Sequence, residues 1–171
     1  MQRATLYCLR GGLLLAAMWL TGNCIAFSII SDVELSIPPQ EREKRERFLQ
    51  LNLISGENEF AVLNVGGYNE SGAAFISAGA VNRSAMSGLN LGLVNQTLIS
   101  GLNVGLYNET ASSALQLGLI NFGWSYVSIA PVNVGAGIQI GLINTGSSAI
   151  QLGLINFCED WILPFFAYCR H

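Results

Sequence analysis

Charged residues are scarce in this chain of 171 residues. Only 11% of the residues are Asp, Glu, Lys or Arg, and the formal net charge is −3. From Leu51 onward the only basic residues are Arg83 and Arg170. Nucleic-acid binding depends on Lys and Arg side chains that neutralise phosphates, so we expect no nucleic-acid partner. Disorder is also excluded, because 51% of the residues are hydrophobic, and disordered chains combine low hydrophobicity with high net charge.

Histidine is nearly absent, since the only one is His171, the last residue. A Ser-His-Asp or Cys-His catalytic arrangement and a multi-histidine metal site both need histidine within a folded site. The chain has four cysteines, but Cys8 belongs to an apparent targeting segment, so a four-cysteine metal site is not expected. These shortages predict a non-enzymatic protein with no cofactor and no metal.

The first residues have the layout of an export signal. Arg3 and Arg10 precede the apolar run Gly11–Leu20, as in a secretory signal peptide. We therefore expect residues 1–28 to be a signal helix, and the protein to be exported.

The residues after this run are similar to a lipobox, in which a small residue precedes a cysteine that becomes lipidated. They read Leu-Thr-Gly-Asn-Cys and end at Cys24, with Asn23 where Gly, Ala or Ser is usual. Acylation of Cys24 would anchor the protein to a membrane by lipid, at the outer membrane or cell surface. Two alternatives stay open. Cleavage after Ala26 or Ser28 would give a periplasmic or secreted protein, and retention of residues 11–30 would leave a signal anchor.

Residues 29–58 form a charged entry segment. The run Glu41–Arg47 consists entirely of charged residues of both signs. Such a run is typical of a solvated helix or linker. We expect a short helix or linker here, which would shield the first unit of the array that follows.

Asparagine sets the period of a tandem array over residues 59–157. The spacing is thirteen residues between the first five members, then twelve, eleven and twelve. Such a period should be recognised before any other motif is sought. The repeat asparagines are Asn69, Asn82, Asn95, Asn108, Asn121, Asn133, Asn144 and Asn156.

Each unit of the array reads as a short strand that ends in a turn. Leu89, Leu91 and Leu93 alternate with other residues, which is the period-two pattern of a strand with one face toward a core. Asn95 follows, and asparagine suits a sharp turn because it tolerates left-handed backbone angles. The repeat asparagines are therefore interpreted as turn residues that end the strands.

Two all-β architectures fit these units. In a β-solenoid each unit forms all or half of a coil, and equivalent residues stack in columns about 4.8 Å apart. In an antiparallel meander or small barrel, successive strands would meet reversed, which gives no simple reason for strict columns. We prefer the solenoid-like stack of 11–13-residue repeats, with the meander or barrel as its alternative.

After Asn156 the pattern changes, and residues 158–171 read as an aromatic C-terminal cap. Cys158 and Cys169 bracket this ending. In an exported protein a disulfide between them would close a short loop and stabilise the fold by roughly 3 kcal/mol. The alternative is two buried free thiols.

The positions that follow the repeat asparagines vary most in the first units. They hold Glu70, Arg83, Gln96 and Glu109, each followed by Ser or Thr. Because they share one place in the repeat, we expect them to form a column on the surface. This column is our candidate contact surface for a protein partner, which the sequence does not identify.

The motif Gly-Leu-Ile-Asn-Phe occurs at 118–122 and again at 153–157, and the ending Trp-Ile-Leu-Pro-Phe-Phe begins at Trp161. These motifs resemble a family of spirochaetal and other bacterial surface-repeat proteins. The resemblance covers residues 59–168 and departs in the first units and at Asn23. It implies an exported protein or lipoprotein and transfers no catalytic residues. The expected function is a scaffold or interaction surface, and the alternative is a small integral outer-membrane β-barrel protein.

Overall fold

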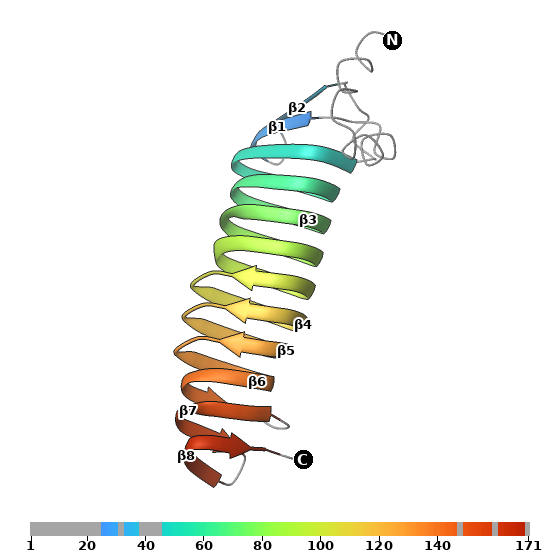
Figure 1. Cartoon of the computed structure of the whole chain (residues 1–171). Coiled ribbons are helices and arrows are strands. Elements are labelled where there is room, and N and C mark those ends of the chain that lie inside the picture. The colour runs from blue at the N-terminus through green and yellow to red at the C-terminus, as the bar shows by residue number, and fades with distance from the viewer. Residues whose placement is uncertain (1–24, 31–32, 38–45, 147–148, 159–160, 170–171) are drawn as a thin grey trace, which may run out of the picture.

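The computed structural model describes residues 25–30, 33–37, 46–146, 149–158 and 161–169. Within them every regular element is a β-strand, and all strands belong to one sheet in the order β2-β1-β3-β4-β5-β6-β7-β8. The ribbon winds into a coiled rod (Figure 1). The strands are β1 (Ile25–Ile30), β2 (Val33–Ile37), β3 (Glu46–Val104), β4 (Tyr107–Leu117), β5 (Ile120–Ile129), β6 (Val132–Thr145), β7 (Ala149–Cys158) and β8 (Trp161–Tyr168).

Neighbouring coils are joined by parallel ladders at the repeat spacing. Val94 pairs with Tyr107, and Tyr107 pairs in turn with Ile120, thirteen residues further on. Ile120 then pairs with Val132, twelve residues away. Each repeat unit therefore forms one full coil, and the predicted all-β solenoid is confirmed. The antiparallel meander is not the arrangement from β3 to β7, where the strands are parallel.

The side chains inside the coils are polar, and most leucines and isoleucines face outward. Asn90 is fully buried, whereas Leu91 is 40% exposed and Leu93 is 55% exposed. Among the described residues, the largest fully buried side chains are all Gln or Asn. The sequence predicted strands with one face toward a core. The structure assigns that core to the asparagine and glycine face, which reverses the usual burial of leucine.

The size of the coil accounts for this reversal. Thirteen extended residues provide only about 43 Å of chain for one full turn. The walls of so small a coil lie close together, and the interior is filled by Asn, Gln, Ser and Thr, whose side chains can hydrogen-bond inside it. Leucine and isoleucine are larger and branched, and they fit on the outside.

The repeat asparagines do not end strands, which corrects their interpretation as turn residues. All eight lie within β3 to β7, and their side chains are buried. None has a positive φ, since Phe165 is the one described non-glycine residue that does (φ 68°). Asparagine suits these positions because its side-chain amide forms hydrogen bonds inside the coil, and not because it tolerates a left-handed backbone.

Of residues 29–58, expected as a short helix or linker, the parts that the structure describes (29–30, 33–37 and 46–58) lie in strands, and the rest lies outside the described residues. β1 pairs in parallel with β3, and β2 pairs antiparallel with β1. The expectation followed the charge run and overlooked the alternation of apolar and polar residues in Val33–Ile37 and again around Gln50. The predicted signal segment up to Cys24 lies outside the described residues, while its last part, Ile25–Ser28, lies in β1. Among the described residues, no helix has the length and apolar character needed to cross a membrane.

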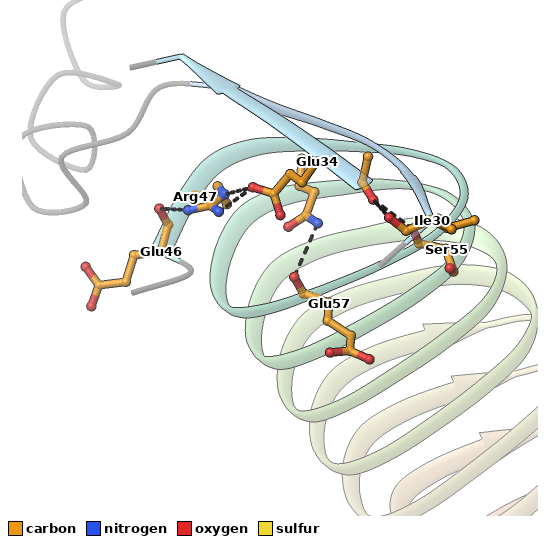
Figure 2. Close-up of polar contacts among 8 residues, drawn as sticks. Ile30, Glu34, Glu46, Arg47, Ser55 and Glu57 are labelled. Atoms are coloured by element: carbon orange, nitrogen blue, oxygen red, sulfur yellow. Dashed lines mark hydrogen bonds and ion pairs between the residues drawn. The ribbon is translucent and has the colours of Figure 1, made fainter. Parts of the chain in front are cut away.

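Polar contacts hold β1 and β2 to the first coil (Figure 2). Arg47 of β3 donates from Nε to Glu34 Oε1 of β2 at 3.0 Å, and from Nη2 to the same oxygen. The Ser28 hydroxyl lies 2.8 Å from the Ile30 carbonyl oxygen and 2.9 Å from that of Ser55. The Arg47 side chain is almost fully buried. A buried ion pair is costly to break, because the partner left behind is an uncompensated charge, so this contact fixes β2 on the coil.

The other end of the rod is closed by β8. This strand runs antiparallel to β7, with Gln151 opposite Ala167. A disulfide joins Cys158 to Cys169, whose Cα atoms are 5.3 Å apart. These two half-cystines pack with Ala167 into a small buried cluster. The aromatic ending thus lies across the last coil as a final, covalently attached strand.

Candidate binding surfaces

The repeat asparagines form a continuous ladder along the rod, which we call the asparagine column. At every step from Asn69 to Asn156, Nδ2 donates to Oδ1 of the next asparagine over 2.8 to 3.3 Å. From Asn69 to Asn144 the same nitrogen also donates to a backbone carbonyl, as from Asn108 to Leu117 at 2.9 Å. Each net bond contributes about 1 kcal/mol. The column therefore fixes the register of neighbouring coils.

Glycine stands three residues before seven of the eight repeat asparagines, and its lack of a side chain leaves space for the ladder. A Cβ on Gly118 would lie 2.7 Å from Asn108 Nδ2 and 2.6 Å from the Gly105 carbonyl oxygen. In one coil Ala130 takes the glycine position, and the adjoining Asn121-to-Asn133 bond is the longest of the ladder at 3.3 Å. Glycine in these strands permits a close approach of side chain and backbone. The same approach recurs at Gly79, Gly92, Gly105, Gly141 and Gly153.

A second buried column lies five residues before the first, and we call it the lead-in column. Its bonding is less regular. Asn90 Nδ2 donates to Asn103 Oδ1 at 2.7 Å, but Gln116 Nε2 donates within its own coil to Ser113 Oγ at 3.1 Å. Among the described residues, the Oε1 atoms of Gln116, Gln139 and Gln151 accept no hydrogen bond. Its members pair with one another across neighbouring strands or are joined by a hydrogen bond. They are Asn90, Asn103, Gln116, Ser128, Gln139 and Gln151.

The predicted contact residues do lie in one column on the outside of the rod, which we call the polar column. Arg83 Nε donates to Gln96 Oε1 at 2.7 Å, and Gln96 Nε2 donates to Glu109 Oε2 at 3.0 Å. Arg83 Nη1 also donates to the Tyr68 hydroxyl at 3.3 Å, and that hydroxyl donates to Glu70 at 3.1 Å. The four residues of the polar column border an open groove, which we call the polar groove. Its lining also includes Ser84, Thr97, Leu98, Thr110, Ala111 and Phe122. The groove offers charges of both signs to a partner.

The polar column ends at Glu109. There, desolvation raises the pKa of the Tyr107 hydroxyl, and the charge and hydrogen bond of Glu109 add to this rise. In the next coil Phe122 stands opposite Glu109, and Val134 stands opposite Phe122. Thr145 follows in this column, and Phe157 stands opposite it near the end of the rod. The same side of the solenoid is therefore charged and polar in its first half and mainly apolar in its second half.

A second surface, the apolar face, consists of two neighbouring outward columns that cross β3 to β8. Successive members stand directly opposite one another in the ladders, and β8 extends both columns with aromatic rings. From Thr110 to Cys158 the sequence contains no charged residue. The members are Leu102, Leu115, Val127, Ile138, Ile150 and Tyr168 in one column, and Val104, Leu117, Ile129, Ile140, Leu152 and Phe166 in the other.

Sequence reasoning found some of these features and missed others. It paired Cys158 with Cys169, and the structure joins them. Cys24 lies outside the described residues. Neither the lead-in column nor the apolar face was predicted, although every late unit carries a signal for both. In motifs such as Leu-Gln-Leu around Gln116, a polar residue stands between two apolar ones. This alternation allows either the polar or the apolar side chains to face inward.

The fold and its internal ladders define a β-solenoid repeat protein. No protein-family model, curated protein or solved structure matches the chain. Its surfaces must therefore be interpreted from their own chemistry.

Proposed function

We propose that this chain is a non-enzymatic, exported scaffold protein of the bacterial cell envelope. It is held at the outer membrane or cell surface by a lipid on Cys24, in the manner of the surface-repeat proteins that its Gly-Leu-Ile-Asn words resemble. The single observation that carries the proposal is the asparagine column, an internal ladder that fixes every coil. Because the fold is secured inside the rod, outward positions can vary in chemistry without changing the scaffold.

The polar column is the proposed contact surface for a protein partner. Its side chains bond to one another along the rod, which orients the Arg83 guanidinium and the Glu109 carboxylate. These contacts are hydrogen bonds between side chains on the outside of the rod, so the residues remain accessible to a partner. Electrostatic complementarity mainly provides specificity and a faster association rate.

The position of β1 supports cleavage immediately before Cys24. Ala26 and Ser28 are 0% and 1% exposed in this strand, and Ser28 bonds to the first coil. Cleavage after Ala26 or Ser28 would remove part of β1 and uncover an edge of the sheet. Cleavage before Cys24 leaves the whole strand attached to the lipidated cysteine.

Palmitate labelling in a bacterial host with a lipoprotein pathway tests the anchor. We expect the full chain to incorporate radiolabelled palmitate and the Cys24→Ser variant to lose the label. Cys8→Ser is the matched control, because Cys8 would leave with the signal peptide, and this variant should be labelled like the parent. Label that persists in Cys24→Ser would reject the lipid anchor.

A further inference from the structure

The coils after Glu109 carry apolar side chains on several sides of the rod. Leu117 lies on the apolar face, Leu119 lies at the bend that follows, and Phe122 continues the line of the polar column. Tyr126 lies just before the apolar face of the next coil, and it is exposed like Leu119 and Phe122. An apolar surface of this extent on a soluble protein marks an interaction site. What covers it must contact several sides of the rod at once.

The polar groups of the same coils are turned inward. Backbone groups of β5 to β7 pair with the strand on either side, while β8 pairs with β7 alone. The amides of Asn121, Asn133 and Asn144 bond within the asparagine column. The outer surface is therefore poor in free hydrogen-bonding groups. Hydrocarbon tolerates such a surface, because its main demand is that backbone and polar groups are satisfied inside the protein.

A second copy of the chain fits this surface less well. The apolar face is two residues wide, or about 7 Å, and crosses six strands, or about 24 Å, which amounts to a few hundred Å² with its side chains. A stable dimer buries about 800 Å² on each partner. A dimer through this face would also leave Leu119, Phe122 and Tyr126 in water, whereas the interface of a bilayer can contact more than one side of the rod.

We propose that the second half of the solenoid, from Leu115 near the end of β4 through β8, lies embedded in the interface of a lipid bilayer with its apolar face toward the acyl chains. This inference rests on the proposed export to the cell envelope, where the chain meets a membrane. Trp124, Tyr126 and Tyr168 supply the aromatic rings that favour the boundary between headgroups and acyl chains. The polar column, in the first half, stays in water and remains open to a protein partner.

Depth-dependent fluorescence quenching tests this contact. The full chain is prepared without its own tryptophans (Trp19→Phe, Trp124→Phe and Trp161→Phe). A single probe is then added as Phe166→Trp on the apolar face, or as Met86→Trp in the first half of the rod. These positions are matched, since the native side chains are 57% and 55% exposed. Each variant is mixed with phosphatidylcholine vesicles whose acyl chains carry bromine or do not.

We expect bromine to quench the Phe166→Trp probe several-fold more strongly than the Met86→Trp probe. Ile140→Lys, added to the Phe166→Trp chain, should weaken the quenching because it places a charge on the apolar face. Ala111→Lys, beside the polar groove, should leave it unchanged. Both sites are exposed, so circular dichroism should show the same strand content in both.

Three results would overturn the bilayer contact. They are equal quenching of the two probes, no quenching of the Phe166→Trp probe, and a dimer that shields this probe from bromine. The last would assign the apolar face to a second copy. Palmitate labelling of Cys24 is scored separately, so loss of the anchor with quenching retained rejects the proposed anchoring and keeps the bilayer contact.

Discussion

The two buried columns of the solenoid are made of similar residues but are bonded differently. In the asparagine column each amide bonds to the next along the whole array, and the residue is Asn in every unit. In the lead-in column the residue changes among Asn, Gln and Ser, and several amide oxygens accept no hydrogen bond among the described residues. A shared buried position is therefore not enough to require one residue type.

The difference follows from geometry. An asparagine such as Asn108 accepts from the coil before it and donates to both the side chain and the backbone of the coil after it. Changing its length by one methylene would disturb all three bonds. Gln116 bonds mainly within its own coil, so a residue of another length can replace it.

The largest effect is expected from breaking the asparagine column. Asn108→Ala would leave the Asn95 amide, the Leu117 carbonyl and the Asn121 side-chain oxygen each short of one bond inside the coil. The Asn95 amide still donates to the Val104 carbonyl. The Leu117 carbonyl still accepts from the Gly105 amide, so the Asn121 oxygen loses the most. At about 1 kcal/mol for each lost bond, we expect a loss of about 3 kcal/mol. Urea unfolding of the full chain, followed by circular dichroism, measures it. A loss below about 1 kcal/mol would remove the ladder from the account of stability.

A smaller effect is expected in the lead-in column. Gln116→Ser introduces the residue that the next coil already carries at Ser128, directly opposite. The change removes one hydrogen bond but also a buried oxygen that has no partner among the described residues, so the net cost should be about 1 kcal/mol. The same urea titration provides the value. If Gln116→Ser cost as much as Asn108→Ala, the two columns would be equivalent and the comparison would fail.

The sequence predicted the stacked coils but not which side chains face the interior. Equal spacing of Asn95, Asn108 and Asn121 favoured coils over an antiparallel meander, because stacked units bring identical residues together. Alternation around Leu91 predicted a strand, but alternation alone does not say which set faces inward. That choice depends on the coil's circumference, which becomes known only once each unit is seen to form a full turn.

The surfaces could be predicted only in part. Glu70 and Arg83 share a position in the repeat, so their alignment on the outside could be predicted. The apolar face could not, because the usual expectation places leucine in a core. Asparagine was likewise assigned to turns from its backbone tendencies, whereas its side-chain bonds along the rod decide its place.

Hydrogen exchange of side-chain amides, followed by nuclear magnetic resonance, tests the inward asparagine column most directly. The Nδ2 protons of Asn95, Asn108 and Asn121 should exchange as slowly as the backbone amides of the central strands, because they are buried and bonded. The Nε2 protons of Gln96, on the outside of the same coils, should exchange rapidly. Asparagine side-chain protons that exchanged as fast as those of Gln96 would contradict the ladder. They would also contradict a solenoid with polar side chains inside and leucines outside.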